Sequence, residues 1–126
     1  MAVRKIMIVD DNKDLLNELQ EILLSSGYET IAIDDCAAVM HIAHNEKPDV
    51  ILLDLKMDTM SGFQIARRLK GLSATAHIPI IAMTGVFTSE DNYLFMNTCG
   101  IKMCIEKPFN PRDVLARIEE VTGTSL

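Results

Sequence analysis

The sequence predicts an α/β fold, a doubly wound parallel sheet in which five strands alternate with five helices. The first observation is a set of short apolar runs that end at polar residues. The run Ile6–Val9, for example, stops at two aspartates, which is typical of buried parallel strands. The second observation is the helical spacing of apolar residues between these runs, as at Leu16, Leu19 and Leu23. Because the two patterns alternate from end to end, the helices are expected to cover both faces of one sheet.

The strands and helices can be located from these patterns and from their start and stop signals. Strands are expected at residues 3–9, 28–33, 50–53, 79–83 and 102–106, and helices before Gly27, over 37–44, after Ser61, over 88–97 and over 111–121. Ser61 and Gln64 have the spacing of a capping box. Asn110 followed by Pro111 is typical of a helix start. The strand at 102–106 is less apolar than the others, which predicts a position near an edge of the sheet.

Composition and length bound the class of protein. A chain of 126 residues fits one domain, 1–126, and no linker, repeat or low-complexity stretch marks an internal boundary. The formal net charge of −6 argues against a nucleic-acid-binding surface. The apolar runs are far shorter than the roughly 20 residues that span a membrane. Cys36, Cys99 and Cys104 form no paired framework, so reduced thiols and a cytoplasmic location are expected.

Polar side chains capable of chemistry follow four of the five predicted strands. Asp10 and Asp11 follow the first strand, Asp54 the third, Thr84 the fourth and Lys107 the fifth. In open α/β sheets, ligands bind beyond the carboxyl ends of the strands, so these side chains are expected to meet there. The first and third strands of the predicted sheet are neighbours, and the three carboxylates are therefore expected to share one crevice.

Three carboxylates in one crevice repel each other, and a divalent cation relieves that repulsion. Hard oxygen ligands favour Mg²⁺. A site that combines this cation with a carboxylate, a hydroxyl and an ammonium group is typical of phosphoryl transfer, with a carboxylate as the nucleophile. An acid after a strand, or a single threonine, is often only a turn or cap residue, so the inference depends on all of them occurring together.

Five motifs carry a resemblance to the receiver domains of bacterial response regulators over nearly the whole chain. They are Ile8-Val9-Asp10-Asp11-Asn12, Leu52-Leu53-Asp54, Met57 followed by Met60-Ser61-Gly62, Met83-Thr84-Gly85 and Lys107-Pro108-Phe109, in this order. The resemblance implies a flavodoxin-like fold, a parallel sheet of strand order 2-1-3-4-5 with five flanking helices in three layers. It also implies two-component signalling, in which the domain accepts a phosphoryl group from a sensor histidine kinase or a phosphotransfer protein and switches partner binding.

The same resemblance implies a role for each acid. Asp54 is the phosphoacceptor. Mg²⁺ is bound directly by Asp11, by Asp54 and by the backbone carbonyl of Lys56, whereas Asp10 acts largely through water. The domain is then no enzyme beyond catalysing its own aspartyl phosphorylation and dephosphorylation.

Thr84 and Lys107 are implied to contact the phosphoryl group, and the Lys107–Pro108 peptide bond is expected to be cis. Two positions depart from the family pattern. Asp58 stands in place of a proline, close to the expected metal site. Cys104 stands in place of the aromatic residue that switches rotamer on the fifth strand. Without that ring, the output has to rely on backbone and loop shifts or on another side chain.

The expected partners follow from the same family pattern. Phosphorylation is expected to rearrange the fourth helix, the fifth strand and the fifth helix, which would bind an effector or a second copy in a homodimer. No direct contact with nucleic acid or membrane is expected. Whether the domain stands alone or comes from a larger regulator is left open by the sequence.

Two rival functions stay open as well. One is an aspartyl-phosphate phosphohydrolase, although such enzymes carry D-x-D after the first strand and a cap insertion. This chain has Asp10-Asp11-Asn12 there and no cap insertion. The other is a degenerate receiver domain that binds its partners constitutively, for which Asp58 and Cys104 leave room.

Two other clusters have weaker functional interpretations. His41 and His44 lie one helical turn apart near Cys36, but a metal site there lacks a fourth ligand, so a solvated helix face is expected. The stretch Tyr93–Met96 is more apolar than a solvated helix needs, and part of it is a candidate docking patch.

Overall fold

The computed structural model describes residues 4–57, 61–85 and 96–123 and confirms the predicted α/β fold. Five parallel strands form one sheet in the order β2-β1-β3-β4-β5, as the family resemblance implies. The strands are β1 (Lys5–Val9), β2 (Glu29–Ile33), β3 (Val50–Asp54), β4 (Ile80–Thr84) and β5 (Ile101–Glu106). The expected edge position of the strand at 102–106 is confirmed, because β5 pairs only with β4 in this sheet.

Helices follow the strands as the sequence predicts, with small shifts of their ends. They are α1 (Lys13–Ser25), α2 (Val39–Glu46) after the short 3₁₀ helix η1 (Cys36–Ala38), α3 (Gly62–Lys70) and α5 (Pro111–Thr122). The helix expected at 88–97 falls mostly outside the described residues, of which 96–98 are helical. Within the described ranges, no helix has the length and apolar character needed to cross a membrane.

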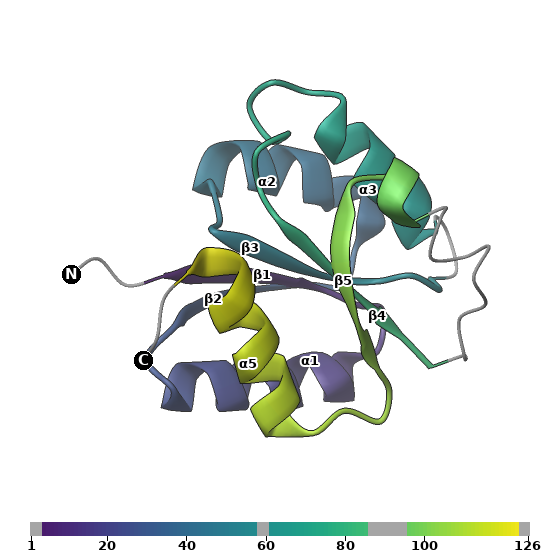
Figure 1. Cartoon of the computed structure of the whole chain (residues 1–126). Coiled ribbons are helices and arrows are strands. Elements are labelled where there is room, and N and C mark those ends of the chain that lie inside the picture. The colour runs from purple at the N-terminus through teal and green to yellow at the C-terminus, as the bar shows by residue number, and fades with distance from the viewer. Residues whose placement is uncertain (1–3, 58–60, 86–95, 124–126) are drawn as a thin grey trace.

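The helices form the outer layers of a three-layer arrangement, with α1 and α5 on one face of the sheet and α2 and α3 on the other (Figure 1). Alternate residues of each strand point to opposite faces, so the sheet contributes to two apolar cores. Met7 and Val9 of β1 belong to the core under α2 and α3, whereas Ile6 and Ile8 belong to the core under α1 and α5. All four side chains are fully buried, which explains the unbroken apolar run in the sequence.

Side-chain caps start three helices soon after a strand has ended. The Asn12 side chain accepts a hydrogen bond from the Leu15 backbone N–H at 3.2 Å and caps α1. Ser61 begins α3 with the predicted capping box. Asn110 caps α5 through a bond from the Arg112 backbone N–H at 2.8 Å. These caps satisfy backbone donors that the first helical turn leaves open, and they keep the loops beyond the strands short.

Gly62, the first residue of α3, lies against the end of β3. Its backbone N–H donates to the Leu55 carbonyl oxygen at 3.1 Å. A Cβ atom at this position would overlap the carbonyl oxygen of Asp54 and would lie 2.8 Å from the Leu55 Cα. Only a residue without a side chain lets α3 approach this strand end so closely. The contact therefore fixes the backbone on which Asp54 sits.

We predict that Gly62→Ala destabilises the domain by about 1–3 kcal/mol, because the added methyl group meets backbone atoms that cannot turn away. Gly71→Ala is the matched control. Its Cβ would meet only helix carbonyl oxygens, the nearer at 3.4 Å, and Gly71 already has right-handed helical angles. The control should therefore leave stability unchanged or raise it by up to about 1 kcal/mol. Urea unfolding curves of both variants check this, and equal effects would contradict the close-contact argument.

Candidate functional site

The candidate site lies beyond the carboxyl ends of four strands. Asp10 follows β1, Asp54 is the last residue of β3, Thr84 ends β4 and Lys107 follows β5. Strand register aligns these ends, because Val9 of β1 pairs with the residue before Asp54. The sequence-predicted position at the strand ends is therefore confirmed.

Three carboxylates meet at this point, as the sequence predicts. Asp10, Asp11 and Asp54 each offer one oxygen, and these oxygens all lie within 4.8 Å of one another. Asp10 and Asp54 are buried, with exposed fractions of 1% and 4%, whereas Asp11 is exposed. The cluster is therefore buried on the side of Asp10 and Asp54 and open to solvent on the side of Asp11. In the part of the chain that the structure describes, this is the one group of three potential metal-ligating side chains.

Backbone N–H groups hold two of these carboxylates in place. Asp10 Oδ1 accepts from the Asn12 N–H at 3.0 Å, and Asp54 Oδ1 accepts from the Lys56 N–H at 3.3 Å. Both bonds come from residues two positions further along the chain, so each loop orients the acid that precedes it. Backbone geometry therefore helps to orient both carboxylates.

Lys107 supplies the positive charge of the site. Its Nζ lies 2.8 Å from Asp10 Oδ2 and 3.3 Å from Asp54 Oδ1, so one ammonium group bridges the acids of two strands. Its backbone N–H donates to the Thr84 carbonyl oxygen at 2.7 Å, which ties the end of β5 to the end of β4. The Lys107–Pro108 peptide bond is cis, in agreement with the resemblance.

Burial and charge perturb the protonation of this site. Burial raises the pKa of Asp54, and the negative charge of Asp10 raises it further, against the opposing effects of Lys107 and the Lys56 N–H. Burial alone would lower the pKa of Lys107, but hydrogen bonding and charge from Asp10 and then Asp54 outweigh it and raise that pKa. Lys107 is therefore a fixed cation, and the acids beside it retain an excess of negative charge.

The cluster fits a hard divalent cation by the chemistry of its donors. All the available side-chain ligands are carboxylate oxygens, which Mg²⁺ and Ca²⁺ prefer. Three carboxylates face a single ammonium group, so a further positive charge would relieve the repulsion that remains. The Lys56 backbone lies beside the cluster, because its N–H donates to Asp54 Oδ1, and the Lys56 side chain is exposed.

The alternative metal site is not supported by the structure. His41 and His44 are both exposed on α2, and His41 is 3.0 Å from the Asn45 amide. Cys36 is buried, and it forms no group of three ligands with the two histidines among the described residues. The expected solvated helix face is confirmed.

Sequence reasoning missed a sulfur contact beside the site. The Cys36 thiol lies 3.7 Å from the Met57 sulfur, which joins η1 to the loop that follows Asp54. Nothing in the spacing of these two residues points to the contact, because they are 21 positions apart and belong to η1 and to the loop after β3. It holds the start of the loop in place, and Asp58, the next residue along, falls outside the described residues.

Cys104 is half-buried on β5 and packs against the core under α2 and α3. Burial raises the pKa of its thiol, and the charge of Glu106 raises it further. The side chain is therefore a neutral thiol in a position where the family pattern has an aromatic ring. Of the expected docking patch Tyr93–Met96, the structure describes Met96 alone, which is buried.

A family model identifies this arrangement. The model of the response regulator receiver domain matches residues 6–119, which include β2 to β5, all of β1 except Lys5, and every acid of the site. The chain belongs to this family. The resemblance to receiver domains that five short motifs indicate thus extends over nearly the whole fold.

Curated relatives agree with the family. The phosphate regulon transcriptional regulatory protein PhoB of Pseudomonas aeruginosa is 36% identical over 96% of this chain. The polar-differentiation response regulator DivK of Brucella anthropi is 28% identical over 95% of this chain. This receiver domain spans about half the length of PhoB, 52%, but 97% of DivK.

Solved structures place the fold among flavodoxin-like receiver domains. The chemotaxis protein CheY4 of Vibrio cholerae has a TM-score of 0.90 at 28% identity, covering 95% of this chain and 99% of that one. The signal receiver domain of a DNA binding response regulator from Colwellia psychrerythraea has a TM-score of 0.86 at 32% identity, covering 96% and 99%. The predicted fold class is confirmed.

We predict that Asp54→Asn stabilises the metal-free domain at neutral pH. A carboxyl group whose folded-state pKa is raised costs stability once the pH exceeds its unfolded value, ordinarily 3.8. The stability of the unsubstituted domain should therefore fall as the pH rises through the interval between the unfolded and folded pKa values, and the variant should not show this fall. The advantage of Asp54→Asn should shrink as the pH is lowered towards the unfolded value.

Urea unfolding in the presence of EDTA, from neutral to mildly acidic pH, measures this difference. Glu21→Gln is the control, because Glu21 is exposed on α1 and loses a charge of the same sign. A gain in Asp54→Asn that does not depend on pH, or one equalled by the control, would contradict the burial of a repelled charge.

Proposed function

We propose that this receiver domain is switched by phosphorylation of Asp54 in a two-component phosphorelay. The phosphoryl donor is the phosphohistidine of a sensor histidine kinase or a phosphotransfer protein. The observation that carries the proposal is the place of Asp54, buried beside Asp10 with the Lys107 ammonium 3.3 Å away. A carboxylate held in this way can accept a transferred group that the ammonium then neutralises.

In the proposed reaction, a carboxylate oxygen of Asp54 attacks the phosphorus atom and the phosphorus–nitrogen bond of the phosphohistidine breaks. The imidazole nitrogen leaves with the electron pair of that bond. Lys107 neutralises negative charge on the phosphoryl oxygens, and the Thr84 hydroxyl donates a hydrogen bond to one of them. Lys107 needs little movement for this role, because its ammonium group already contacts Asp54.

The proposed metal ion is Mg²⁺, held by Asp11, Asp54 and the backbone carbonyl of Lys56, with Asp10 acting through water. When bound, the ion supplies positive charge to the phosphoryl oxygens. The support for this assignment is the all-oxygen cluster, whose members lie within 4.8 Å of one another. Asp11 is exposed at the rim, where a hydrated ion has access.

The proposed output surface consists of the fourth helix, β5 and α5, where an effector binds. Cys104 has no ring to swing inward, and in this proposal the signal passes through the backbone rather than through another side chain. The 2.7 Å bond from the Lys107 N–H to the Thr84 carbonyl oxygen supports such a route, since it couples the ends of β4 and β5. Residues 1–126 form one domain in this proposal, which acts in the cytoplasm, contacts neither nucleic acid nor membrane directly, and could self-associate as a homodimer.

The domain is proposed to be no enzyme beyond its own phosphorylation and dephosphorylation. No observation favours the phosphohydrolase or the constitutive binding module over the receiver switch. Turnover of a generic phosphomonoester distinguishes the first rival, and we expect none. Partner binding that does not change on phosphorylation would identify the second.

We predict that incubation with Mg²⁺ and a small acyl phosphate adds one phosphoryl group to the domain. Asp54→Asn should abolish the addition, because the nucleophilic oxygen is lost, and EDTA should suppress it in the unsubstituted chain. Asp49→Asn, the same change at an acid of the opposite end of the sheet, should leave it intact. Intact mass spectrometry measures the addition. A phosphoryl group that persists in Asp54→Asn would refute the proposed acceptor.

We predict that Mg²⁺ stabilises the domain against unfolding through the acid cluster. A ligand that binds only the folded state stabilises it by about 2.7 kcal/mol at a hundred times its dissociation constant. Asp11→Asn should weaken this effect, whereas Asp14→Asn, three residues further along and also exposed, should preserve it. Thermal unfolding over a Mg²⁺ titration provides the measurement, and equal behaviour of the two variants would argue against Asp11 as a ligand.

A further inference from the structure

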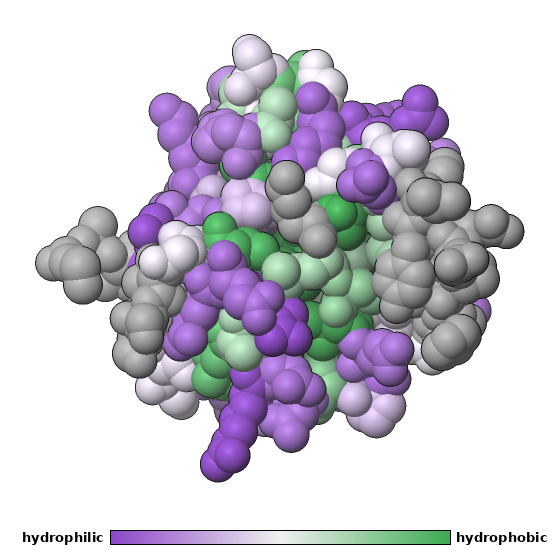
Figure 2. All heavy atoms as spheres, in the orientation of Figure 1, coloured by the Kyte–Doolittle hydropathy of each residue, from purple (hydrophilic) through white to green (hydrophobic). Residues whose placement is uncertain are grey.

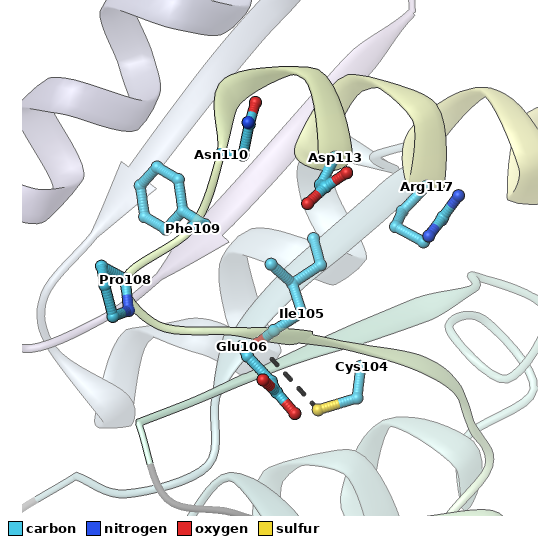
Figure 3. A pocket seen from close by; sticks show the side chains of 8 residues that line it. All are labelled: Cys104, Ile105, Glu106, Pro108, Phe109, Asn110, Asp113 and Arg117. Carbon is cyan, nitrogen blue, oxygen red and sulfur yellow. Dashed lines mark hydrogen bonds between the residues drawn. The ribbon is translucent and has the colours of Figure 1, made fainter.

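A cavity of about 380 Å³ opens where β5 meets the start of α5. Cys104, Ile105 and Glu106 line it from β5, and Asp113 and Arg117 line it from α5 (Figure 3). We call it the β5–α5 pocket. Its size falls in the range of about 300–1,000 Å³ that is common for ligand sites. Figure 2 shows apolar surface along β5, bordered by hydrophilic surface of α5.

The pocket lies across the edge of the sheet. Neighbouring residues of a strand point to opposite faces, so Glu106 and Cys104 lie on one side of β5 and Ile105 on the other. Ile105 belongs to the core under α1 and α5, and Cys104 packs against the core under α2 and α3. Asp113 lies on α5, on the same side as Ile105 (Figure 3). The pocket therefore carries one acid on each side of the β5 edge.

Neither acid is neutralised within the described part of the chain. The side chains of Glu106 and Asp113 are both exposed, and neither makes a hydrogen bond or ion pair with a described residue. An unpaired carboxylate at the rim of a cavity attracts a cation, and two of them attract it more strongly. The pocket thus has a net preference for positive charge.

Arg117 would be the natural partner of Asp113, because an acid four residues before a basic residue favours an ion pair on a helix. The structure has a different pair. The Arg117 Nη2 atom donates to Glu120 Oε1 at 2.6 Å, on the side towards the end of α5. The Nε atom of Arg117 is buried without a hydrogen-bond partner. With the Arg117 guanidinium paired to Glu120, the Asp113 carboxylate can pair with a cationic group of another molecule.

We propose that the β5–α5 pocket binds a basic segment of a partner protein, which lies across the β5 edge and presents one cationic side chain to Glu106 and another to Asp113. Arginine and lysine suit the pocket because their aliphatic stems can pack on Pro108 and Phe109 while their head groups meet the acids. The proposal rests on the proposed function in one respect: it names the chemistry of the effector that the output surface binds.

Charge argues against a second copy of this chain as the occupant. A symmetric dimer through this surface would use the same patch on both subunits. Among the described residues that line the pocket, Glu106 and Asp113 are unpaired acids, whereas Arg117 is already paired with Glu120. Two copies would therefore bring unpaired like charges together, in a chain whose formal net charge is already −6. A basic partner meets the opposite sign instead.

Three synthetic peptides of equal length test whether the pocket binds a basic segment. In the first peptide leucine alternates with arginine, in the second with glutamine and in the third with glutamate. Each is titrated into the unmodified, isotope-labelled domain, and backbone amide shifts and fluorescence anisotropy are recorded. We expect the arginine peptide to bind best and to shift the amides of residues 104–117. Equal binding of the glutamate peptide, or shifts confined to other residues, would overturn the proposal.

Substitutions identify the acids. Glu106→Gln and Asp113→Asn should each lower the affinity of the domain for the arginine peptide about threefold, which is the effect of losing one exposed ion pair. Glu21→Gln, an exposed acid of α1 outside the pocket, should leave affinity unchanged. Glu120→Gln releases Arg117 towards Asp113 and should weaken binding about as much as Asp113→Asn. Unchanged affinity in both pocket variants would overturn the proposal, as would equal losses in Glu21→Gln. Amide spectra of each variant confirm that it is folded.

Experiments on the same protein samples would detect other occupants of the pocket. A dimer seen by sedimentation and lost in Asp113→Asn would overturn the basic-segment proposal in favour of a second copy. Spermidine that binds as tightly as the arginine peptide and displaces it would favour a small polyamine instead. The peptide titration needs no phosphorylation, so its failure refutes the pocket alone, whereas failure of Asp54 to gain a phosphoryl group refutes the proposed function alone.

Discussion

Repulsion among three carboxylates is the constraint on which the rest of this structure depends. Asp10 and Asp54 are buried at the ends of neighbouring strands, where their charges are costly, and the ammonium of Lys107 compensates only part of that cost. The caps of the adjoining helices and the backbone N–H groups of the loops hold the acids together in spite of it. The fold therefore holds an excess of negative charge at the carboxyl ends of the strands. A cation or a covalent modification at this point would change that balance.

Several features could be predicted from the sequence because they are local. An unbroken apolar run in the sequence predicts a buried strand. An acid at the end of such a run, as at Asp54, predicts both where the strand ends and where the site lies. Capping pairs such as Ser61 and Gln64 are equally local, and the structure has the capping box that they predict. The order of the strands was not local information. It came from the likeness to receiver domains, since no pattern within a strand specifies which strand lies beside it.

Other features could not be read from the sequence, because they depend on rotamers and on contacts between distant loops. The spacing of Asp113 and Arg117 favours an ion pair, yet the guanidinium turns to Glu120 instead. The Cys36–Met57 contact joins η1 to the loop after β3, and no motif connects these two segments. The bridge from Lys107 to both acids likewise depends on where a long, flexible side chain comes to rest. Residue types at strand ends predicted which groups would meet, but not which atoms would touch.

The ammonium bridge also joins parts of the chain that are far apart in sequence. Lys107 and Asp10, whose side chains lie 2.8 Å apart, are separated by 97 positions along the chain. A contact of such long range forms only after the intervening strands have assembled. During synthesis, a chain that has not yet added β5 would present the acids of β1 and β3 without their counter-charge. A chain cut before Lys107 would therefore lack the contact that ties the acids of β1 and β3 to a shared positive charge.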